Sequence, residues 1–227
     1  MSCNLKCRHC GSFAGSSHDR ELNAQECDKI ADDLAAMKCE KFTLGGGEPT
    51  LYPRWREIGK RLSDQGVKVN IISNGLNRTQ AHVEKAFQAG LKNVAFSLDG
   101  FEKAHDFVRR YDSFRRVVEA IDVSISMGMP VSIVSHINTL NYKKLRQFRR
   151  LLAKHGVSAW QVQLGIPSGS MCENQELVIQ PEDLLWLIPE IANMRSEPET
   201  RPATVVWRFC RGAFSLLDHP RIIGLAD

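Results

Sequence analysis

The sequence has no apolar run near the roughly 20 residues needed to cross a bilayer, and its start, Met-Ser-Cys-Asn-Leu-Lys-Cys, contains no signal-peptide hydrophobic region. The net charge is also small, because 30 basic and 26 acidic residues leave a formal charge of only +4. So small an excess favours neither nucleic acid nor an anionic membrane as a partner. We therefore expect a cytoplasmic protein, with no membrane and no nucleic acid among its partners.

Long linkers and low-complexity segments are absent as well, and 227 residues of which 43% are hydrophobic suffice for one substantial core. The stretch from Ser196 to Pro202, rich in Glu, Pro and Arg, has the composition of a connection. We expect a main domain over residues 1–195 and a short C-terminal tail over residues 196–227.

Between the cysteine-rich start and that tail, helical periodicity alternates with short apolar runs. Four helical segments end at a residue followed at once by glycine, the preferred residue just past a helix: Gln65, Ala89, Met127 and His155. Strands are predicted at Lys41–Leu44, Val67–Ser73, Asn93–Leu98, Val131–Ile137 and Ala159–Leu164. Helix starts are marked by Asn23 with Glu26 and by Pro181. The fold class is α/β, a parallel sheet or barrel.

Such folds carry their functional loops at the carboxyl ends of the strands. Polar or glycine-rich segments follow each predicted strand: Gly45 to Thr50, Ser73 to Gly75, Ser97 to Gly100, His136 with Asn138, and Gln163. We expect these segments to line one rim of the sheet.

The strongest chemical signal is the C-x3-C-x2-C spacing of Cys3, Cys7 and Cys10. One short loop with three thiolates can wrap a 4Fe-4S cluster and leave one iron open to bind a cofactor or substrate. A structural zinc site completed by His9 or His18 is the alternative, disfavoured because no second cysteine pair has zinc-finger spacing.

The other four of the seven cysteines carry less information. Cys27 and Cys39 are interpreted as small core residues within and just after a helix. Cys172 and Cys210 lie beyond the predicted strands, where a second cluster is a lesser alternative.

The cysteine motif, followed after the next strand by Gly46-Gly47-Glu48-Pro49, resembles the radical S-adenosylmethionine (SAM) superfamily over residues 3 to 165. The resemblance implies a partial (β/α)6-type TIM barrel. Only Met1 and Ser2 precede Cys3, so the first barrel strand of the family is expected to be missing here.

The resemblance also implies the cofactors. Cys3, Cys7 and Cys10 would hold a 4Fe-4S cluster whose open iron binds SAM, and reductive cleavage would give a 5'-deoxyadenosyl radical that abstracts hydrogen. A flavodoxin or ferredoxin would supply the electron. Eight further residues are expected to bind SAM: Gly46, Gly47, Glu48, Pro49, Asn74, Ser97, Asp99 and Arg109. No residue is assigned as a substrate-side acid or base.

The segment from Trp160 to Met171 resembles the SPASM-type subgroup, which mostly modifies peptides and proteins and continues into a cysteine-rich auxiliary-cluster region. The tail over residues 196–227 is expected to be a truncated remnant of that extension. A peptide or protein substrate is the leading hypothesis. The alternatives are an inactive cluster-binding fragment and a tRNA-modifying enzyme.

Overall fold

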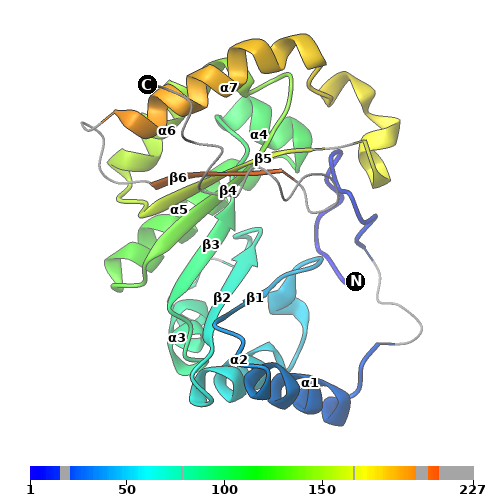
Figure 1. The fold of residues 1–227 in the computed structure, drawn as a ribbon, viewed down its shortest axis with the longest axis vertical. Coiled ribbons are helices and arrows are strands. Elements are labelled where there is room, and N and C mark those ends of the chain that lie inside the picture. Colours follow the sequence, from blue (N-terminus) through cyan, green and yellow to red (C-terminus); the bar gives the residue numbers. More distant parts are fainter. Residues whose placement is uncertain (16–20, 78, 166, 198–203, 210–227) are drawn as a thin grey trace.

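A computed structural model of the chain describes residues 1–15, 21–77, 79–165, 167–197 and 204–209 (Figure 1). The α-helices are α1 (Ala24–Ala36), α2 (Trp55–Asp64), α3 (Gln80–Gln88), α4 (Glu102–Val108), α5 (Ser113–Ser126), α6 (Leu145–Lys154) and α7 (Pro181–Ser196). The strands are β1 (Lys41–Leu44), β2 (Lys68–Ser73), β3 (Asn93–Ser97), β4 (Val131–Ile137), β5 (Ala159–Leu164) and β6 (Thr204–Phe209). Short 3-10 turns are η1 (Pro49–Leu51), η2 (Tyr142–Lys144), η3 (Gly169–Glu173) and η4 (Gln175–Leu177).

The six strands form one parallel sheet in the order of the chain, each paired with the next. The sheet curves, its helices lie on the outer side, and the N-terminal segment lies beside the carboxyl ends of the strands (Figure 1). β1 is an edge strand, paired only with β2 among the described residues. The predicted α/β class and incomplete barrel are confirmed.

The predicted helix ends are also confirmed. Gln65, Ala89, Met127 and His155 are the C-caps of α2, α3, α5 and α6, and the glycine after each has a positive φ between 72° and 85°. Asn23 and Glu26 form a reciprocal capping box at the start of α1.

The strands do not have the two fully buried faces that their apolar composition suggested. In β4 and β5 buried and half-buried residues alternate. Trp160 and Val162 are buried on the helix-covered face. There Trp160 packs edge-on against Phe148 of α6, with the two ring centroids 5.5 Å apart. Gln161 and Gln163 take the alternate positions and face the concave side. The concave side is therefore partly open and polar.

β6 occupies a segment to which the sequence analysis assigned no element, within the predicted tail. It pairs with β5 over the full length of both strands, and it extends the sheet. None of the helices in the described part of the chain combines the length and apolarity needed to cross a membrane.

Candidate cluster and cofactor site

The three motif cysteines line one cavity of about 360 Å³ at the carboxyl ends of the strands. Each of Cys3, Cys7 and Cys10 is half-buried and none forms a disulfide. Backbone hydrogen bonds hold their loop in place, from Cys3 N to Gly15 O at 3.1 Å and from Cys10 N to Cys7 O at 3.1 Å. The three thiols therefore share a solvent-accessible chamber with the strand ends.

The thiols have different acidities. Burial raises the pKa of Cys7 to about 11 and also raises the pKa of Cys3. Burial acts in the same direction on Cys10, but hydrogen bonds from the backbone of Ala14 and Ser12 outweigh it and lower the Cys10 pKa. Because a bound cation stabilises thiolates strongly, an iron-sulfur cluster bound here would supply the positive charge that Cys3 and Cys7 need to ionise.

A zinc site does not fit this geometry as well. No three His, Cys, Asp or Glu side chains within the described ranges converge closely enough to hold a single ion. His9 uses Nε2 to hydrogen-bond Asp99 Oδ2 at 2.8 Å, and His18 lies outside the described residues. Three separated thiols around one chamber suit a cluster, which is larger than an ion.

The glycine-rich loop after β1 packs directly on the start of the cysteine loop. Glu48 N donates to Ser2 O at 2.9 Å. A Cβ added to Gly47 would lie 2.1 Å from that same oxygen, so only glycine fits there. Gly46 has φ +126°, which side chains rarely adopt. Both glycines line the chamber, as the interpretation as a cofactor loop requires.

Glu48 and Pro49 lie elsewhere. Both are buried, and they border a separate open cavity of about 480 Å³ instead of the chamber. The Glu48 carboxylate accepts hydrogen bonds from Thr50 N and Oγ1, at 3.2 and 2.6 Å, and from Ser73 Oγ at 2.9 Å. It also accepts from Asn74 N at 2.7 Å. Glu48 thus ties the loop to the end of β2.

Asn74, Ser97 and Arg109 line the chamber, as expected of residues that meet a cofactor. The Asn74 side chain donates to Asn4 Oδ1 at 2.7 Å and accepts from Leu76 N at 3.0 Å. Arg109 is 11% exposed and lies beside Cys7, with Nη1 3.9 Å from Cys7 Sγ.

Asp99 does not line the chamber and is fully buried. Oδ2 accepts from His9 Nε2 at 2.8 Å and from Arg109 Nε at 2.6 Å, and Oδ1 accepts from His136 N at 2.8 Å. Burial alone would raise the pKa of Asp99, but the charge of Arg109 and the contact with His9 hold it well below its usual value. Asp99 is therefore an ionised, buried side chain that holds His9, Arg109 and the backbone of His136 together.

Several chamber residues were not assigned to the site from the sequence, among them His136, Gln163 and Gly165, although the first two had been placed on the rim. His136 and Gln163 are paired neighbours on β4 and β5, and both line the chamber. Both ring nitrogens of His136 are buried and have no hydrogen-bond partner among the described residues, and burial lowers the His136 pKa to about 3. Gly165 leaves room for that ring, because a Cβ there would lie 1.7 Å from His136 Nε2.

The segment after β5 closes over the cysteine loop. Ser170 N donates to Cys10 O at 2.8 Å. A Cβ at Gly169 would lie 2.3 Å from the same oxygen. This contact was not predicted. The sequence cannot distinguish a glycine that is needed because another backbone packs against it from one that is needed for a turn.

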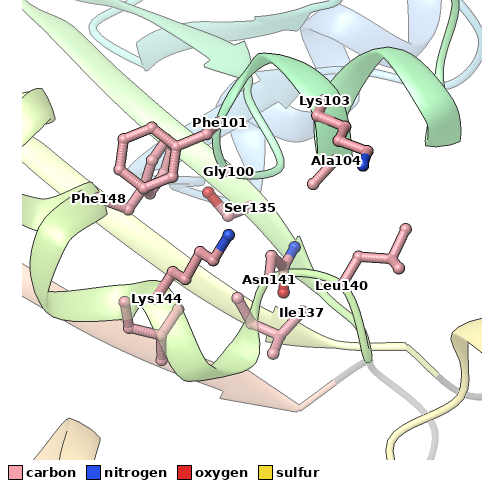
Figure 2. Close-up of a pocket in the computed structure, with 11 residues that line it drawn as sticks. Gly100, Phe101, Lys103, Ala104, Ser135, Ile137, Leu140, Asn141, Lys144 and Phe148 are labelled. Carbon is pink, nitrogen blue, oxygen red and sulfur yellow. The ribbon is translucent and has the colours of Figure 1, made fainter.

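A further pocket lies on the helix-covered side of β4 (Figure 2). It is bordered by Gly100, Phe101, Ser135 and Asn141 among others, but its volume is only about 40 Å³. That volume admits water and not a nucleotide cofactor. The 360 Å³ chamber is the candidate site.

Comparison with known proteins identifies the family and the fold. The profile of the Radical SAM superfamily matches residues 2–153. The mycofactocin maturase MftC of Mycolicibacterium smegmatis is 32% identical over 159 residues, which are 69% of this chain and 41% of the relative. An AdoMet-dependent heme synthase of Methanosarcina barkeri is 29% identical over 198 residues, 86% of this chain and 56% of the relative. The chain thus spans about half the length of these curated relatives.

Solved structures share the fold. Streptococcus suis SuiB bound to S-adenosylmethionine aligns with a TM-score of 0.76 at 15% identity, over 92% of this chain and 48% of SuiB. The AdoMet-bound anSMEcpe aligns with a TM-score of 0.70 at 15% identity, over 86% of this chain and 57% of the other.

Proposed function

The chain belongs to the radical SAM superfamily, and on that premise we propose that it supplies the core of an enzyme that cleaves SAM reductively to modify a peptide or protein. The observation that carries the proposal is the convergence of Cys3, Cys7 and Cys10 with the glycines of the Gly46-Gly47 loop on one chamber of about 360 Å³.

The superfamily uses a 4Fe-4S cluster and SAM, which together supply a 5'-deoxyadenosyl radical for hydrogen abstraction. In this chain Cys3, Cys7 and Cys10 would ligate three irons. The backbone of Gly46 and Gly47 can approach the methionyl end of SAM closely, since no side chain intervenes. The same chamber is also lined by one cationic side chain, Arg109, and by the polar side chains of Asn74 and Ser97. Glu48, Pro49 and Asp99 support these residues from outside the chamber.

Two observations support a peptide over a tetrapyrrole substrate. The relatives include maturases of peptides, among them the sporulation killing factor maturation protein SkfB of Bacillus subtilis, 31% identical over 141 residues. These residues are 62% of this chain and 34% of SkfB. Arg109 is the one arginine or lysine among the described residues that line the chamber, and Asp99 already neutralises it. A substrate with several propionates would need more basic groups.

The electron for reductive cleavage would come from a small carrier protein such as flavodoxin or ferredoxin. The half-exposed face of the cysteine loop supports this, because Cys10 is covered only in part by its neighbours. A reducing cytoplasm would keep such thiols available for cluster assembly.

The proposal is tested by anaerobic reconstitution with iron and sulfide, followed by EPR of the dithionite-reduced protein with and without SAM. We expect one 4Fe-4S cluster per chain, a spectrum that changes when SAM is added, and release of 5'-deoxyadenosine. A Cys3/Cys7/Cys10 triple alanine variant should show none of the three.

Bound zinc, or no metal at all, would contradict the proposal. A cluster that binds SAM but yields no 5'-deoxyadenosine would favour an inactive cluster-binding fragment. The substrate class is tested separately, by comparing SAM turnover with peptide mixtures, iron-porphyrins and tRNA; stimulation only by porphyrin or tRNA would contradict the peptide assignment.

A further inference from the structure

Asp99 was expected to meet SAM, yet both of its carboxylate oxygens are used within the protein. One oxygen joins His9, in the cysteine loop, to Arg109, at the end of α4, and the other accepts from the backbone of His136. The Asp99 side chain is 0% exposed. No part of the carboxylate is left to bind a molecule in the chamber, so its role is to place its partners.

The backbone of Asp99 is fixed from both sides. Asp99 N donates to His105 Nδ1 at 3.0 Å, and Asp99 O accepts from Asn141 Nδ2 at 3.1 Å. Asn141 lies on the helix-covered side of the sheet, beside Gly100 (Figure 2). The carboxylate is thereby held in one position relative to the sheet.

This placement determines where the charge of Arg109 lies. Its Nε donates to Asp99 at 2.6 Å, and the planar guanidinium then directs Nη1 toward Cys7 Sγ at 3.9 Å. No other carboxylate within the described ranges forms an ion pair with Arg109. The sulfur of Cys7 therefore lies near Nη1 of a cation whose charge is balanced by one buried anion bound at Nε.

We propose that Asp99 is a positioning residue that holds Arg109 against the sulfur of Cys7 and thereby sets the reduction potential of the cluster that Cys7 ligates. The inference rests on the proposed function, since it requires the cluster. Adding an electron makes a cluster more negative, so a nearby cation favours the reduced state and a nearby anion disfavours it.

The two members of the pair have opposite effects. In Asp99→Asn the side-chain oxygen can still accept from Arg109 Nε and hold the guanidinium near Cys7, but the balancing negative charge is lost, so the potential should rise above that of the wild type. In Arg109→Gln the cation is lost while the carboxylate remains, so the potential should fall. In the Asp99→Asn/Arg109→Gln double variant both charges are absent, and the potential should return toward the wild-type value.

The experiment is an EPR-monitored redox titration of the reconstituted full chain without SAM, with iron and sulfide content measured for each variant. Asp106→Asn is the matched control, because the Asp106 carboxylate accepts from Asp112 N and Phe114 N at 2.8 Å and forms no ion pair with Arg109. Its potential should stay at the wild-type value. Local damage to the fold would not produce shifts of opposite sign.

Equal potentials for the wild type and both single variants, or shifts of the same sign, would overturn the inference. If Asp99→Asn retained no cluster, Arg109→Gln alone would decide, and anything other than a fall in potential would count against the proposal. A wild-type protein that takes up no cluster would contradict the proposed function itself, which separates the two failures.

Discussion

The carboxylate of Glu48 accepts a 2.7 Å hydrogen bond from the backbone N–H of Asn74, so the glycine-rich loop is fastened to the neighbouring strand end through one buried side chain. In Glu48→Gln the amide N–H₂ group replaces one carboxylate oxygen, and it must then face either Asn74 N or Thr50 N, both of which are hydrogen-bond donors. We expect a loss of about 2–3 kcal/mol in the free energy of unfolding. Urea denaturation of the metal-free protein measures it.

Glu57→Gln is the control for that substitution. Glu57 is 57% exposed and pairs with Arg54 on the surface of α2, so its loss should change stability by less than about 0.5 kcal/mol. Similar losses for Glu48→Gln and Glu57→Gln would show that Glu48 is not an internal anchor.

Gly47→Ala should disconnect the glycine loop from the cysteine loop. Its Cβ would lie 2.1 Å from Ser2 O and 3.2 Å from Cys3 Cβ, so Ser2 and Cys3 must move. Gly45→Ala is the matched control, since nothing lies within 4 Å of a Cβ there. We expect iron and sulfide per chain to fall sharply in Gly47→Ala alone, measured after anaerobic reconstitution. Equal cluster content in both variants would contradict this contact.

Gly165→Ala should displace the His136 ring, because the new methyl would lie 1.7 Å from His136 Nε2. Because His136 lines the chamber, a shifted ring would change the shape of the cofactor site, and we expect SAM affinity to fall by about tenfold, equivalent to about 1.4 kcal/mol. In a His136→Ala background the same substitution meets no ring and should have little effect on the SAM dissociation constant. Additive effects of the two substitutions would refute a clash between them.

Acid should destabilise the metal-free protein through His105. Burial, with a smaller effect of the Arg109 charge, lowers its pKa from 6.5 to about 4. Between these pH values the unfolded chain binds a proton that the folded protein excludes, so stability falls as pH falls, by at most about 1.4 kcal/mol per pH unit.

Glutamine keeps a hydrogen-bond acceptor but does not titrate. From pH 7.5 to 5 the wild type should therefore lose about 2 kcal/mol more than His105→Gln. Urea melts at several pH values measure this, and parallel stability curves for the two proteins would exclude His105 as the source.

The alternation of strands and helices could be predicted from the sequence because each helix end is marked by residues only a few positions apart. A glycine follows each of four helices, and the Asn23–Glu26 capping box requires only residues three positions apart. β6 escaped prediction although Thr204–Phe209 is rich in β-branched and aromatic residues, because no helix-ending glycine precedes it.

The site was predicted in part for a related reason. Cys3, Cys7, Cys10, Gly46, Gly47, Asn74, Ser97 and Arg109 all line one chamber. Glu48 and Asp99 come from the same strand ends but point into the protein. The direction of a side chain after a strand depends on donors contributed by other elements, such as Ser73 for Glu48 and Arg109 for Asp99. No local pattern encodes these partners.

The consecutive order of the strands bears on how the protein is made. Each strand pairs with the one before it, so the sheet can grow during translation, one β-α unit at a time. The cysteine loop is the exception, because its anchors, Asp99, Arg109 and Ser170, lie much later in the sequence and are synthesised after it. The loop can therefore reach its folded position only after those anchors have been synthesised, and a cluster held there would be inserted after that point.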